Sequence, residues 1–578
     1  MNFFGKLFYI LPKSKKNKLV YLFFLLLIGM AFEMLGLGLL IPALTLMLSA
    51  NIEEDYPFIS PFLDYLGNPQ QDQLIIWGIL FLVLVYFLKG IFLIFLAWEQ
   101  SKFTSNLQSE LTAKLYEIYL RQYYEFHLLR NSAELIRNVQ TEIILFNRAA
   151  QALILLSTEL SLIIGVIAML LFIEPLGTLV VMIVLVISVI IFNALTQGYL
   201  IKWAEKRQVL SKKINQVLLE GLGGVKDIKL LGREDSFIYK YSLNNYRWAK
   251  INSLQLTLLQ VPRMYLEILG IIGLSILVIV MVLQGRSVEA LLPTLVIFAA
   301  GAFKMIPGFN RIMGAIQNVK LTVPVVNVLY DEFKLKSKEK LNQKIKDFNF
   351  NNNIVLNNLN FKYQDTHKYS LENINININF GETIGFMGES GSGKSTLIDL
   401  FLGLINPEKG EIIVDGQNIK KNIRGWQNNI GYVPQSIYLS DDSLKNNIAF
   451  GISENKIDDK AVLRSLKSAQ LDDLIKSSDD GLNTFVGERG VRLSGGQRQR
   501  IGIARALYHD PKVLVLDEAT SALDSDTEKG VMESISVLKG KKTILIVAHR
   551  LTTLKNCDKI FKLENGKIID NLYSNQIT

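Results

Sequence analysis

Hydrophobic residues are distributed unevenly along this 578-residue chain. In residues 1–320 they form long uncharged stretches, whereas residues 340–578 show short apolar runs between segments rich in Lys, Asn and Asp. A stretch of about 20 apolar residues is long enough to cross a bilayer as a helix. We therefore predict six membrane spans: Leu19–Leu48, Leu74–Ala97, Ala149–Ile173, Leu176–Leu195, Leu256–Leu283 and Val288–Met313.

The connections between these spans alternate in length and in charge. Residues 98–148 and 196–255 have helical periodicity and few breakers, so we expect the helices to extend beyond the membrane. These two connections contain six and eleven Lys and Arg residues, whereas residues 49–73 contain none and 284–287 contain only Arg286. The positive-inside rule then predicts that both termini lie in the cytosol.

The net charge and the cysteine content agree with the prediction of membrane spans. A net charge of +9 raises the question of nucleic acid, but the basic residues gather beside the spans, so we predict no nucleic-acid partner. The single cysteine, Cys557, excludes an intrachain disulfide framework and fits a reducing compartment. The first apolar segment is too long for a signal peptide and lacks a clear cleavage site, so we expect a retained span.

A glycine-rich segment follows a short apolar strand, Thr383 to Met387, in the polar half of the chain. It fits the pattern G-x-x-x-x-G-K-[ST], in which backbone N–H groups close around phosphate oxygens. In this pattern Lys394 supplies a positive charge and the Ser395 hydroxyl can hold Mg²⁺. The segment consists of Gly388, Glu389, Ser390, Gly391, Ser392, Gly393, Lys394, Ser395 and Thr396.

Two further motifs narrow this prediction beyond a general nucleotide-hydrolysing enzyme. A second apolar strand ends in Asp517 and Glu518, suited to a metal-binding carboxylate followed by one that activates water. Between the two phosphate-site motifs lies LSGGQ, which starts at Leu493 and continues with Ser494, Gly495, Gly496 and Gln497. With all three motifs in this order, residues 347–578 resemble the ABC ATPases.

The resemblance implies roles for four further residues, two of which, Tyr363 and His549, also have a plainer interpretation. Tyr363 would stack on adenine, although a tyrosine more simply packs in a core. Gln435 would reach Mg²⁺ and the attacking water, and Asp524 would cross the dimer interface. His549 would contact the γ-phosphate of ATP, although a lone histidine is more often structural.

The same resemblance implies a second chain. In the family, Ser494 and Gly496 close over the γ-phosphate bound by the glycine-rich loop of the opposite ATPase domain. This chain has one ATPase domain and every motif residue is intact, so a homodimer is the simplest expectation. The segment Val486–Gly490 also matches one associated with exporters, just before LSGGQ.

The whole chain resembles the ABC exporter half-transporters. The expected fold is a six-helix, all-α transmembrane domain with long cytosolic extensions, followed by an α/β P-loop ATPase domain. We place the membrane domain at 1–320, a charged linker at 321–346 and the nucleotide-binding domain at 347–578. Residues Tyr123–Glu142 and Glu220–Phe237 resemble the loops that transmit ATPase motion to the membrane helices in this family.

Four cations inside the spans point to the transported substrate. Charged residues in membrane helices cost free energy and are by default functional. At about 1.5 Å per helical residue, the four cations of this chain lie roughly 22 to 34 Å below the outer ends of their spans. A phosphate or pyrophosphate headgroup would suit such a belt; alternatively, the cations extend to the interface or pair with Glu99 or Glu267. The four are Lys89, Arg263, Lys304 and Arg311.

Segments Phe32–Leu44, Val261–Glu267 and Lys304–Ile312 resemble the bacterial lipid-linked oligosaccharide flippases. That family carries arginine where this chain has Lys89 and Lys304, so charge is kept and bidentate geometry is lost. The resemblance implies ATP- and Mg²⁺-dependent flipping of a polyprenyl-pyrophosphate glycan across the bacterial inner membrane. The aromatic residues of the 49–73 loop would contact either the polyprenyl tail or the membrane interface.

Other functions stay open at this stage. The first alternative is an exporter of lipid A-like lipids or drugs on the same fold. A second is an ABC protein that uses ATP for gating rather than pumping, which intact Glu518 and His549 disfavour. A peptide exporter with a processing protease is disfavoured because only about eighteen residues precede the first predicted span.

Overall fold

The computed structural model describes most of the chain as two compact units. The first comprises residues 1–122 and 127–338, and the second comprises residues 123–126 and 339–578. The described residues are 1–48, 71–173, 175–283, 288–335, 348–363, 366, 368–476, 478–487, 490–519, 525–548 and 550–573. The aromatic residues predicted to contact lipid in the 49–73 loop therefore lie outside the described residues.

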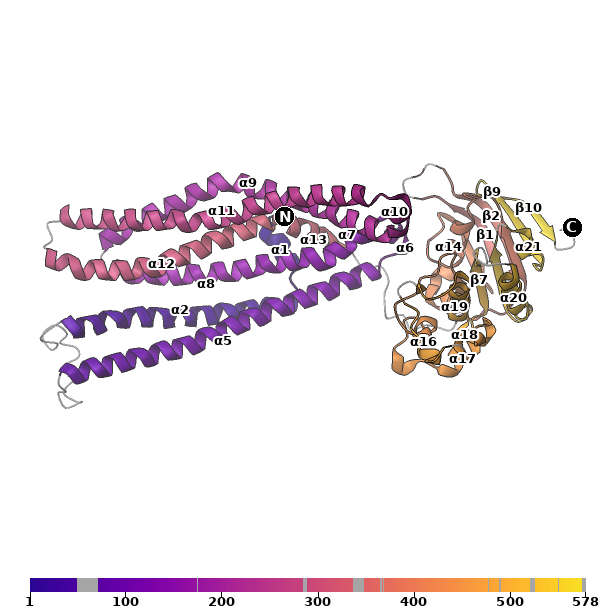
Figure 1. The fold of residues 1–578 in the computed structure, drawn as a ribbon, viewed down its shortest axis with the longest axis horizontal. Coiled ribbons are helices and arrows are strands. Elements are labelled where there is room, and N and C mark those ends of the chain that lie inside the picture. Colours follow the sequence, from indigo (N-terminus) through magenta and orange to yellow (C-terminus); the bar gives the residue numbers. More distant parts are fainter. Residues whose placement is uncertain are drawn as a thin grey trace. The chain divides into compact units, whose positions relative to one another are not determined.

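The first unit is helical, and its long helices contain all six predicted spans (Figure 1). Three of these helices have 49 or 50 residues, far longer than the roughly 20 residues that a bilayer requires. The predicted extensions beyond the membrane are thus confirmed. The six helices are α2 (Lys13–Leu48), α5 (Gln71–Leu120), α8 (Ile143–Ile173), α9 (Pro175–Gly223), α11 (Glu234–Leu283) and α12 (Val288–Leu321).

Length and composition identify five membrane-spanning helices among the described residues, or six when one bent pair is counted as a span. The bent pair joins the end of α12 to α13 (Val323–Lys334) at an angle of 47°. The shorter helices of this unit are α1 (Phe3–Ile10), α7 (Ser132–Arg137), the π-helical turn η1 (Asn138–Glu142) and α10 (Val225–Leu231), and α6 (Tyr124–Leu129) has residues in both units. Four of these short elements, α6, α7, η1 and α10, lie in the two predicted coupling loops.

Helix α13 falls within the segment that the sequence predicts as a linker. It packs against α1, where Lys6 Nζ donates a hydrogen bond to Asn327 Oδ1 at 2.8 Å and the Tyr9 and Tyr330 rings meet edge to face. Tyr330 is buried in this contact. Apolar residues of α13 recur at helical spacing and face inward, so the charged appearance of this stretch hides a packed helix.

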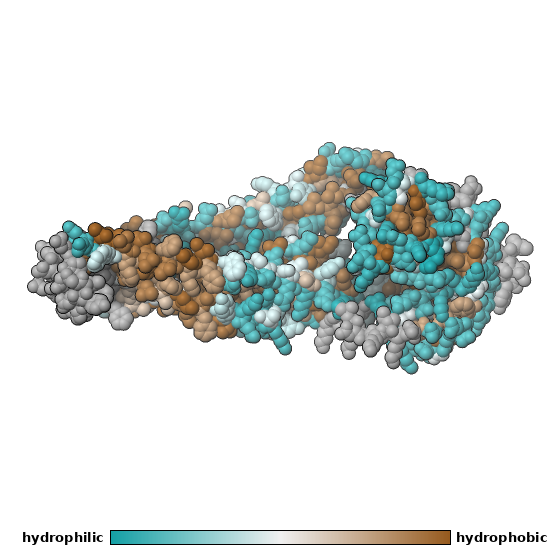
Figure 2. All heavy atoms as spheres, turned by 90° about the horizontal axis from the view of Figure 1, so that it is seen from below, coloured by the Kyte–Doolittle hydropathy of each residue, from teal (hydrophilic) through white to brown (hydrophobic). Residues whose placement is uncertain are grey.

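The membrane unit has an apolar interior and an apolar outer surface. Leu266 of α11, Val166 of α8 and Met305 of α12 belong to one buried cluster. On α5, by contrast, Leu80, Phe87 and Ile94 are more than half exposed. Figure 2 shows hydrophobic side chains gathered along this part of the unit. Large apolar residues exposed over such a length fit a lipid environment.

The ATPase unit contains two β-sheets. The four-stranded sheet has the order β2-β1-β4-β5 and is antiparallel. In β2 the sequence LENINININ alternates, so Ile374, Ile376 and Ile378 are buried while the asparagines face outward. The strands are β1 (Asn353–Phe361), β2 (Leu371–Asn379), β4 (Lys409–Val414) and β5 (Gln417–Asn418).

The six-stranded sheet positions the site and has the order β10-β9-β3-β8-β7-β6. Its strands β3, β8, β7 and β6 pair in parallel, so their carboxyl ends lie along one edge. Strands β3, β7 and β8 are almost wholly buried, as their uninterrupted apolar sequences predict. The bounds are β3 (Thr383–Met387), β6 (Ile430–Val433), β7 (Val513–Asp517), β8 (Thr543–Val547), β9 (Lys559–Glu564) and β10 (Lys567–Tyr573).

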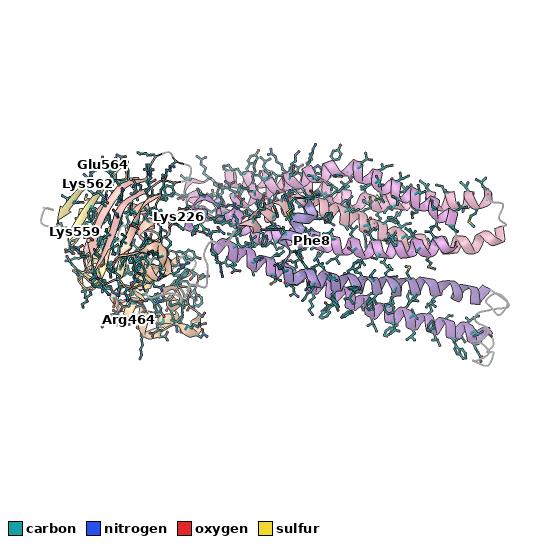
Figure 3. The ribbon with its side chains drawn as sticks, turned by 180° about the vertical axis from the view of Figure 1, so that it is seen from behind. Phe8, Lys226, Arg464, Lys559, Lys562 and Glu564 are labelled. Atoms are coloured by element: carbon teal, nitrogen blue, oxygen red, sulfur yellow. The ribbon has the colours of Figure 1, made fainter. Side chains whose placement is uncertain are left out.

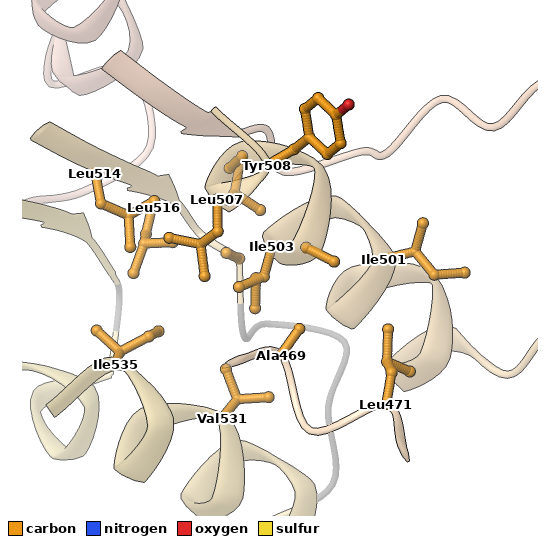
Figure 4. Close-up of a cluster of buried hydrophobic side chains, with 14 of the residues drawn as sticks. Ala469, Leu471, Ile501, Ile503, Leu507, Tyr508, Leu514, Leu516, Val531 and Ile535 are labelled. Atoms are coloured by element: carbon orange, nitrogen blue, oxygen red, sulfur yellow. The ribbon is translucent and has the colours of Figure 1, made fainter. Parts of the chain in front are cut away.

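Helix α19 (Gly495–Leu507), which follows the LSGGQ serine, is anchored in the core of the ATPase unit. Ile503 and Leu507 of α19 belong to the same buried cluster as Leu514 and Leu516 of β7 (Figure 4). The LSGGQ motif and the carboxylate-bearing strand are therefore held in one rigid core. The other helices of this unit with at least five residues are α14 (Lys394–Phe401), α15 (Ile423–Gln427), α16 (Leu444–Ile448), α17 (Asp459–Ser468), α18 (Asp472–Lys476) and α20 (Ser525–Ser536).

Candidate functional site: a nucleotide site and charged pairs in the membrane helices

The glycine-rich loop joins the buried end of β3 to the first turn of α14. Gly393, directly before the helix, has φ = 103°, a conformation that side chains rarely adopt. A Cβ on Gly393 would also lie 2.7 Å from the Ser370 carbonyl oxygen. The chain thus requires glycine here, and the turn directs the N-terminus of an eight-residue helix toward the loop, an arrangement suited to phosphate.

Lys394 is buried beside this loop although it carries a charge. Its Nζ donates hydrogen bonds to the carbonyl oxygens of Gly388 and Glu389 at 2.8 and 2.9 Å. Burial lowers the pKa of Lys394, while the negative charges of Glu518 and Asp517 oppose that decrease. The ammonium is therefore fixed within the loop and electrostatically coupled to both predicted carboxylates.

Asp517 is the last residue of β7 and Glu518 follows it, at the same sheet edge. Gln435, two residues beyond β6, donates from Nε2 to Glu518 Oε2 at 2.7 Å. Tyr432 donates a hydrogen bond to Asp517 Oδ2 at 3.4 Å. Glu518 has φ = 49°, an uncommon backbone conformation for a residue other than glycine, and such strain often occurs at functional sites.

The electrostatics of Asp517 favour a bound cation. Burial raises the pKa of Asp517, and the neighbouring Glu518 raises it further. Two adjacent carboxylates in a half-buried site repel each other, and a divalent cation relieves that repulsion. The oxygen-rich set of Asp517, Ser395 and the Gln435 amide suits Mg²⁺, whose other ligands are typically water and phosphate oxygens.

Asp399 is a third acidic group in this region, and the sequence prediction missed it. It lies on α14, one helical turn beyond Ser395. Burial raises the pKa of Asp399 to about 6, with a further contribution from Asp517. The signal in the sequence was the i, i+4 spacing from Ser395, which places both residues on one helix face.

Tyr363 lies close to the phosphate loop. Its hydroxyl is 3.2 Å from Thr396 Oγ1, and its ring meets Phe361 edge to face at 5.0 Å. The ring is half-buried against the core beneath the four-stranded sheet. Its position next to the loop is compatible with adenine stacking, which stays a prediction.

Ser494 caps the N-terminus of α19. Its Oγ accepts a hydrogen bond from the Gln497 backbone N–H at 3.1 Å, and Gln497 Oε1 accepts one from the Ser494 backbone N–H at 2.8 Å. This reciprocal capping box fixes the serine at the positive end of a 13-residue helix. Contact with a phosphate on a second chain stays a prediction.

Two predicted site residues, Asp524 and His549, lie outside the described residues, as do Glu488 and Arg489 of the segment before LSGGQ. The strand that precedes His549 is described: β8 ends at Val547 and lies between β3 and β7. The roles of both residues stay predictions.

Of the four predicted membrane cations, two form ion pairs with buried acids on another helix. Lys89 of α5 contacts Glu33 of α2, with Nζ and Oε2 separated by 2.7 Å and both residues buried. Arg311 of α12 donates from Nε and Nη2 to Glu159 of α8, at 2.5 and 3.0 Å. The sequence prediction missed both glutamates, although each is the only charged residue of its predicted span.

The remaining two cations differ from these. Arg263 pairs with Glu267 one turn along α11 at 3.1 Å, and both side chains are exposed. Arg263 thus forms the pair with Glu267 that the sequence analysis considered, and its contact with a headgroup stays a prediction. Glu99, the other acid considered, instead contacts Lys102 at 3.7 Å. Lys304 lies in α12, and its side chain is outside the described part of the structure.

Comparison with known proteins gives matches in both halves of the chain. The family model of the ABC transporter transmembrane region matches residues 19–303, and the family model of the ABC transporter matches residues 371–521. An ATP-dependent lipid A-core flippase from Cupriavidus pinatubonensis is 41% identical over 219 residues. A putative multidrug export ATP-binding/permease protein from Staphylococcus aureus is 44% identical over 218 residues. Each match spans 38% of this chain and only 37% of the relative.

The fold also matches that of a solved structure over nearly the whole chain. A bacterial Atm1-family ABC exporter with ATP bound superposes with a TM-score of 0.80, covering 98% of this chain and 96% of that one. The two share 20% sequence identity, so this likeness concerns the fold alone. The chain therefore belongs to the ABC transporters, as a multi-pass half-transporter that has the exporter fold and carries a membrane region and a nucleotide-binding domain.

Proposed function

We propose that two copies of this chain bind MgATP and hydrolyse it to move a substrate across the bacterial inner membrane, with both termini in the cytosol. One observation supports the ATPase activity above all. The phosphate loop, Asp517, Glu518 and Gln435 all follow parallel strands of one sheet and meet at its carboxyl edge. That edge is where α/β proteins bind their ligands.

The proposal assigns a role to each residue of the site. The loop N–H groups and Lys394 bind the phosphates, and Ser395, Asp517 and Gln435 would hold Mg²⁺. When bound, Mg²⁺ neutralises charge that develops on the phosphate oxygens. Glu518, oriented by its hydrogen bond from Gln435, accepts a proton from the attacking water. His549 would contact the γ-phosphate, Tyr363 the adenine, and Asp524 the dimer interface.

We propose a homodimer because the family resemblance implies that Ser494 acts on nucleotide bound by another copy. The capping box already satisfies the backbone N–H groups of Ser494 and Gln497 within the chain, so the serine hydroxyl hydrogen remains to be donated. Mixing Ser494→Arg chains with Lys394→Ala chains should produce heterodimers with one dead and one intact site. ATPase activity should reappear in the mixture. A fully active monomer at high dilution contradicts the two-chain site.

For the substrate we propose a polyprenyl-pyrophosphate-linked glycan. The sequence resemblance to lipid-linked oligosaccharide flippases supports it, and so does the geometry of Arg311. The Arg311 side chain is 45% exposed, and among the described residues its hydrogen bonds to Glu159 use Nε and Nη2. A guanidinium has five N–H donors, so the Nη1 side is available for a phosphate oxygen.

The buried Lys89–Glu33 pair supports a different role for Lys89. Its Nζ lies 4.7 Å from the centre of the Tyr86 ring and 2.7 Å from Glu33 Oε2. Groups of the protein therefore already balance the positive charge of Lys89. We therefore assign Lys89 to the α2–α5 contact. The headgroup contacts of the proposal rest on Arg263, Lys304 and Arg311.

The names of the two relatives favour a second candidate function, the export of a lipid A-like lipid or a drug. A flipping assay separates the two. In proteoliposomes, wild-type protein should translocate a lipid-linked oligosaccharide in an ATP-dependent manner, and Arg263→Ala combined with Lys304→Ala should lose flipping while keeping basal ATPase. If the double variant flips normally, or if only lipid A-like lipids are moved, the second candidate replaces the first.

A further inference from the structure

We infer that the cytosolic end of the first two spans binds an anionic membrane phospholipid in a groove beside helix α1. The groove combines an apolar part with a basic part, and the two share Leu22 of α2 and Phe103 of α5. This site is separate from the proposed substrate contacts, because neither lining includes Lys89, Arg263, Lys304 or Arg311.

The apolar part is a cavity of about 270 Å³ between α1, α2, α5 and α8. Phe8, labelled on α1 in Figure 3, and Phe146 and Ala150 of α8 are among its lining residues. The one polar lining residue, Ser157, already donates its hydroxyl to the Leu153 carbonyl oxygen. The cavity therefore offers only hydrocarbon contacts. Its volume lies just below the usual range for ligand pockets, so it has room for part of one acyl chain and not for a whole glycolipid.

The basic part has a volume of about 330 Å³. Lys15, Lys18 and Lys102 line it together with one acidic residue, Glu99. Lys15 contacts Glu110 at 3.2 Å and Lys102 contacts Glu99 at 3.7 Å, whereas Lys18 is exposed. Asn17, Tyr21 and Asn106 add hydrogen-bonding groups around the lysines. Three lysines against two carboxylates, Glu99 and Glu110, leave a net positive charge, which complements a phosphate and not a neutral headgroup.

Helix α1 places this groove at the membrane interface. Phe4 and Phe8 are at least half exposed, whereas Leu7 and Ile10 are buried against the unit. A short helix that exposes aromatic rings and precedes a run of lysines is typical of a segment lying in the headgroup region. The positive-inside rule assigns that run to the cytosolic leaflet, where anionic lipids meet basic side chains.

The occupant is therefore an anionic phospholipid with one chain between α1 and α8 and its phosphate among the lysines. The test uses the purified full-length chain and native mass spectrometry with dioleoyl phosphatidylglycerol or dioleoyl phosphatidylcholine. Phosphatidylglycerol should be retained preferentially. Lys18→Gln combined with Lys102→Gln should weaken its retention by roughly 25-fold, since each lysine near an anionic membrane surface contributes a factor of about five.

Three comparisons make the result specific. Lys16→Gln combined with Lys114→Gln removes the same charge from the same two helices outside the groove and should leave retention unchanged. Lys18→Arg combined with Lys102→Arg should restore it. Ala150→Phe fills the apolar cavity and should reduce retention of dioleoyl lipid but not of a short-chain phosphatidylglycerol. Basal ATPase activity reports that each variant is folded.

Equal retention of the two lipids, or equal loss in the Lys16 and Lys114 control, overturns the inference. Co-purification of a polyprenyl pyrophosphate lipid in place of phosphatidylglycerol also overturns it, and would instead assign the groove to substrate entry. These outcomes are independent of the flipping assay, so the lipid site and the proposed substrate fail or stand separately.

Discussion

The two units of this chain arrange their charged side chains in opposite ways. At the nucleotide site, like charges are held together: Asp517, Glu518 and Asp399 lie around the same sheet edge, and the pKa values of Asp517 and Asp399 are raised. In the membrane helices, opposite charges are paired: Lys89 with Glu33, and Arg311 with Glu159. The first arrangement is destabilised until a cation and phosphates enter, whereas the second is satisfied within the protein.

This difference has a physical basis. A cluster of acids beside a lysine is tolerated without a bound ligand in a partly solvated site, because water screens the repulsion between the carboxylates. Inside a bilayer an unpaired charge is costly, so a partner must already be present in the protein. In the ATPase unit, a cluster of charged residues therefore indicates a ligand site directly. In the membrane unit, a charged residue indicates a ligand site only if it has N–H donors that its ion pair does not use, as Arg311 does.

The largest expected effect is on hydrolysis. Glu518→Gln keeps the shape of the side chain and removes its basicity, so ATP should still bind while turnover falls by roughly 10²- to 10⁴-fold. Steady-state ATPase assays and nucleotide-binding measurements check this. Glu564→Gln, an exposed acid on β9, is the matched control and should be near normal. Turnover close to wild type in Glu518→Gln contradicts the assignment of Glu518 as the base.

The next effect is on stability, in the membrane unit. Lys89→Ala leaves Glu33 buried without its cation, and breaking one partner of a buried pair costs about 3–5 kcal/mol. The thermal unfolding midpoint in detergent should fall markedly. Glu33→Gln combined with Lys89→Gln removes both charges and should recover most of the loss. Arg263→Ala breaks an exposed pair and should cost about 1 kcal/mol or less. Equal losses in Lys89→Ala and Arg263→Ala contradict the contrast between buried and exposed pairs.

The sequence predicted the architecture well because its strongest signals are local. Long apolar stretches predicted the spans, and the order of the glycine-rich loop, LSGGQ and Asp517 predicted the α/β ATPase unit. It did not predict α13, because the charged face of Asp331–Lys334 obscures the apolar face made by Val325, Val326 and Leu329.

The site was predictable only where motifs fix its residues. Lys394, Asp517, Glu518 and Gln435 come together as their motifs indicate, but Asp399 belongs to no motif that the sequence analysis used. The pairs in the membrane depend on which helices are neighbours, and helix adjacency is a long-range property. Glu33 and Glu159 were visible as isolated acids, yet nothing local specified their partners.

A smaller effect is expected on substrate handling at Arg311. Arg311→Lys keeps a positive charge for Glu159 and removes the planar fork that can engage a second acceptor. Flipping of a lipid-linked oligosaccharide should fall by roughly three- to tenfold, with basal ATPase unchanged. Arg263→Lys, which changes an exposed side chain, serves as the comparison and should have a weaker effect. Normal flipping by Arg311→Lys would mean that Arg311 only holds α12 against α8.

The smallest expected effect is the pH dependence of stability that arises from Asp399. Its pKa is raised from 3.8 to about 6 by burial and by Asp517, so the folded state binds the proton more tightly than the unfolded state. Protonation therefore stabilises the fold, and this contribution is lost as the pH rises from about 4 through about 6.

Asp399→Asn removes the titration, so its unfolding midpoint, relative to wild type, should be higher at pH 7 than at pH 5. Asp510→Asn is the control, because Lys542 lowers the pKa of Asp510 below 3.8 and no titration of that group falls between pH 5 and 7. Thermal unfolding of the full-length chain at both pH values measures the difference. An Asp399→Asn variant that parallels the wild type across this range would show that Asp399 is ionised throughout, and the contrast between crowded acids and paired charges would then rest on Asp517 and Glu518 alone.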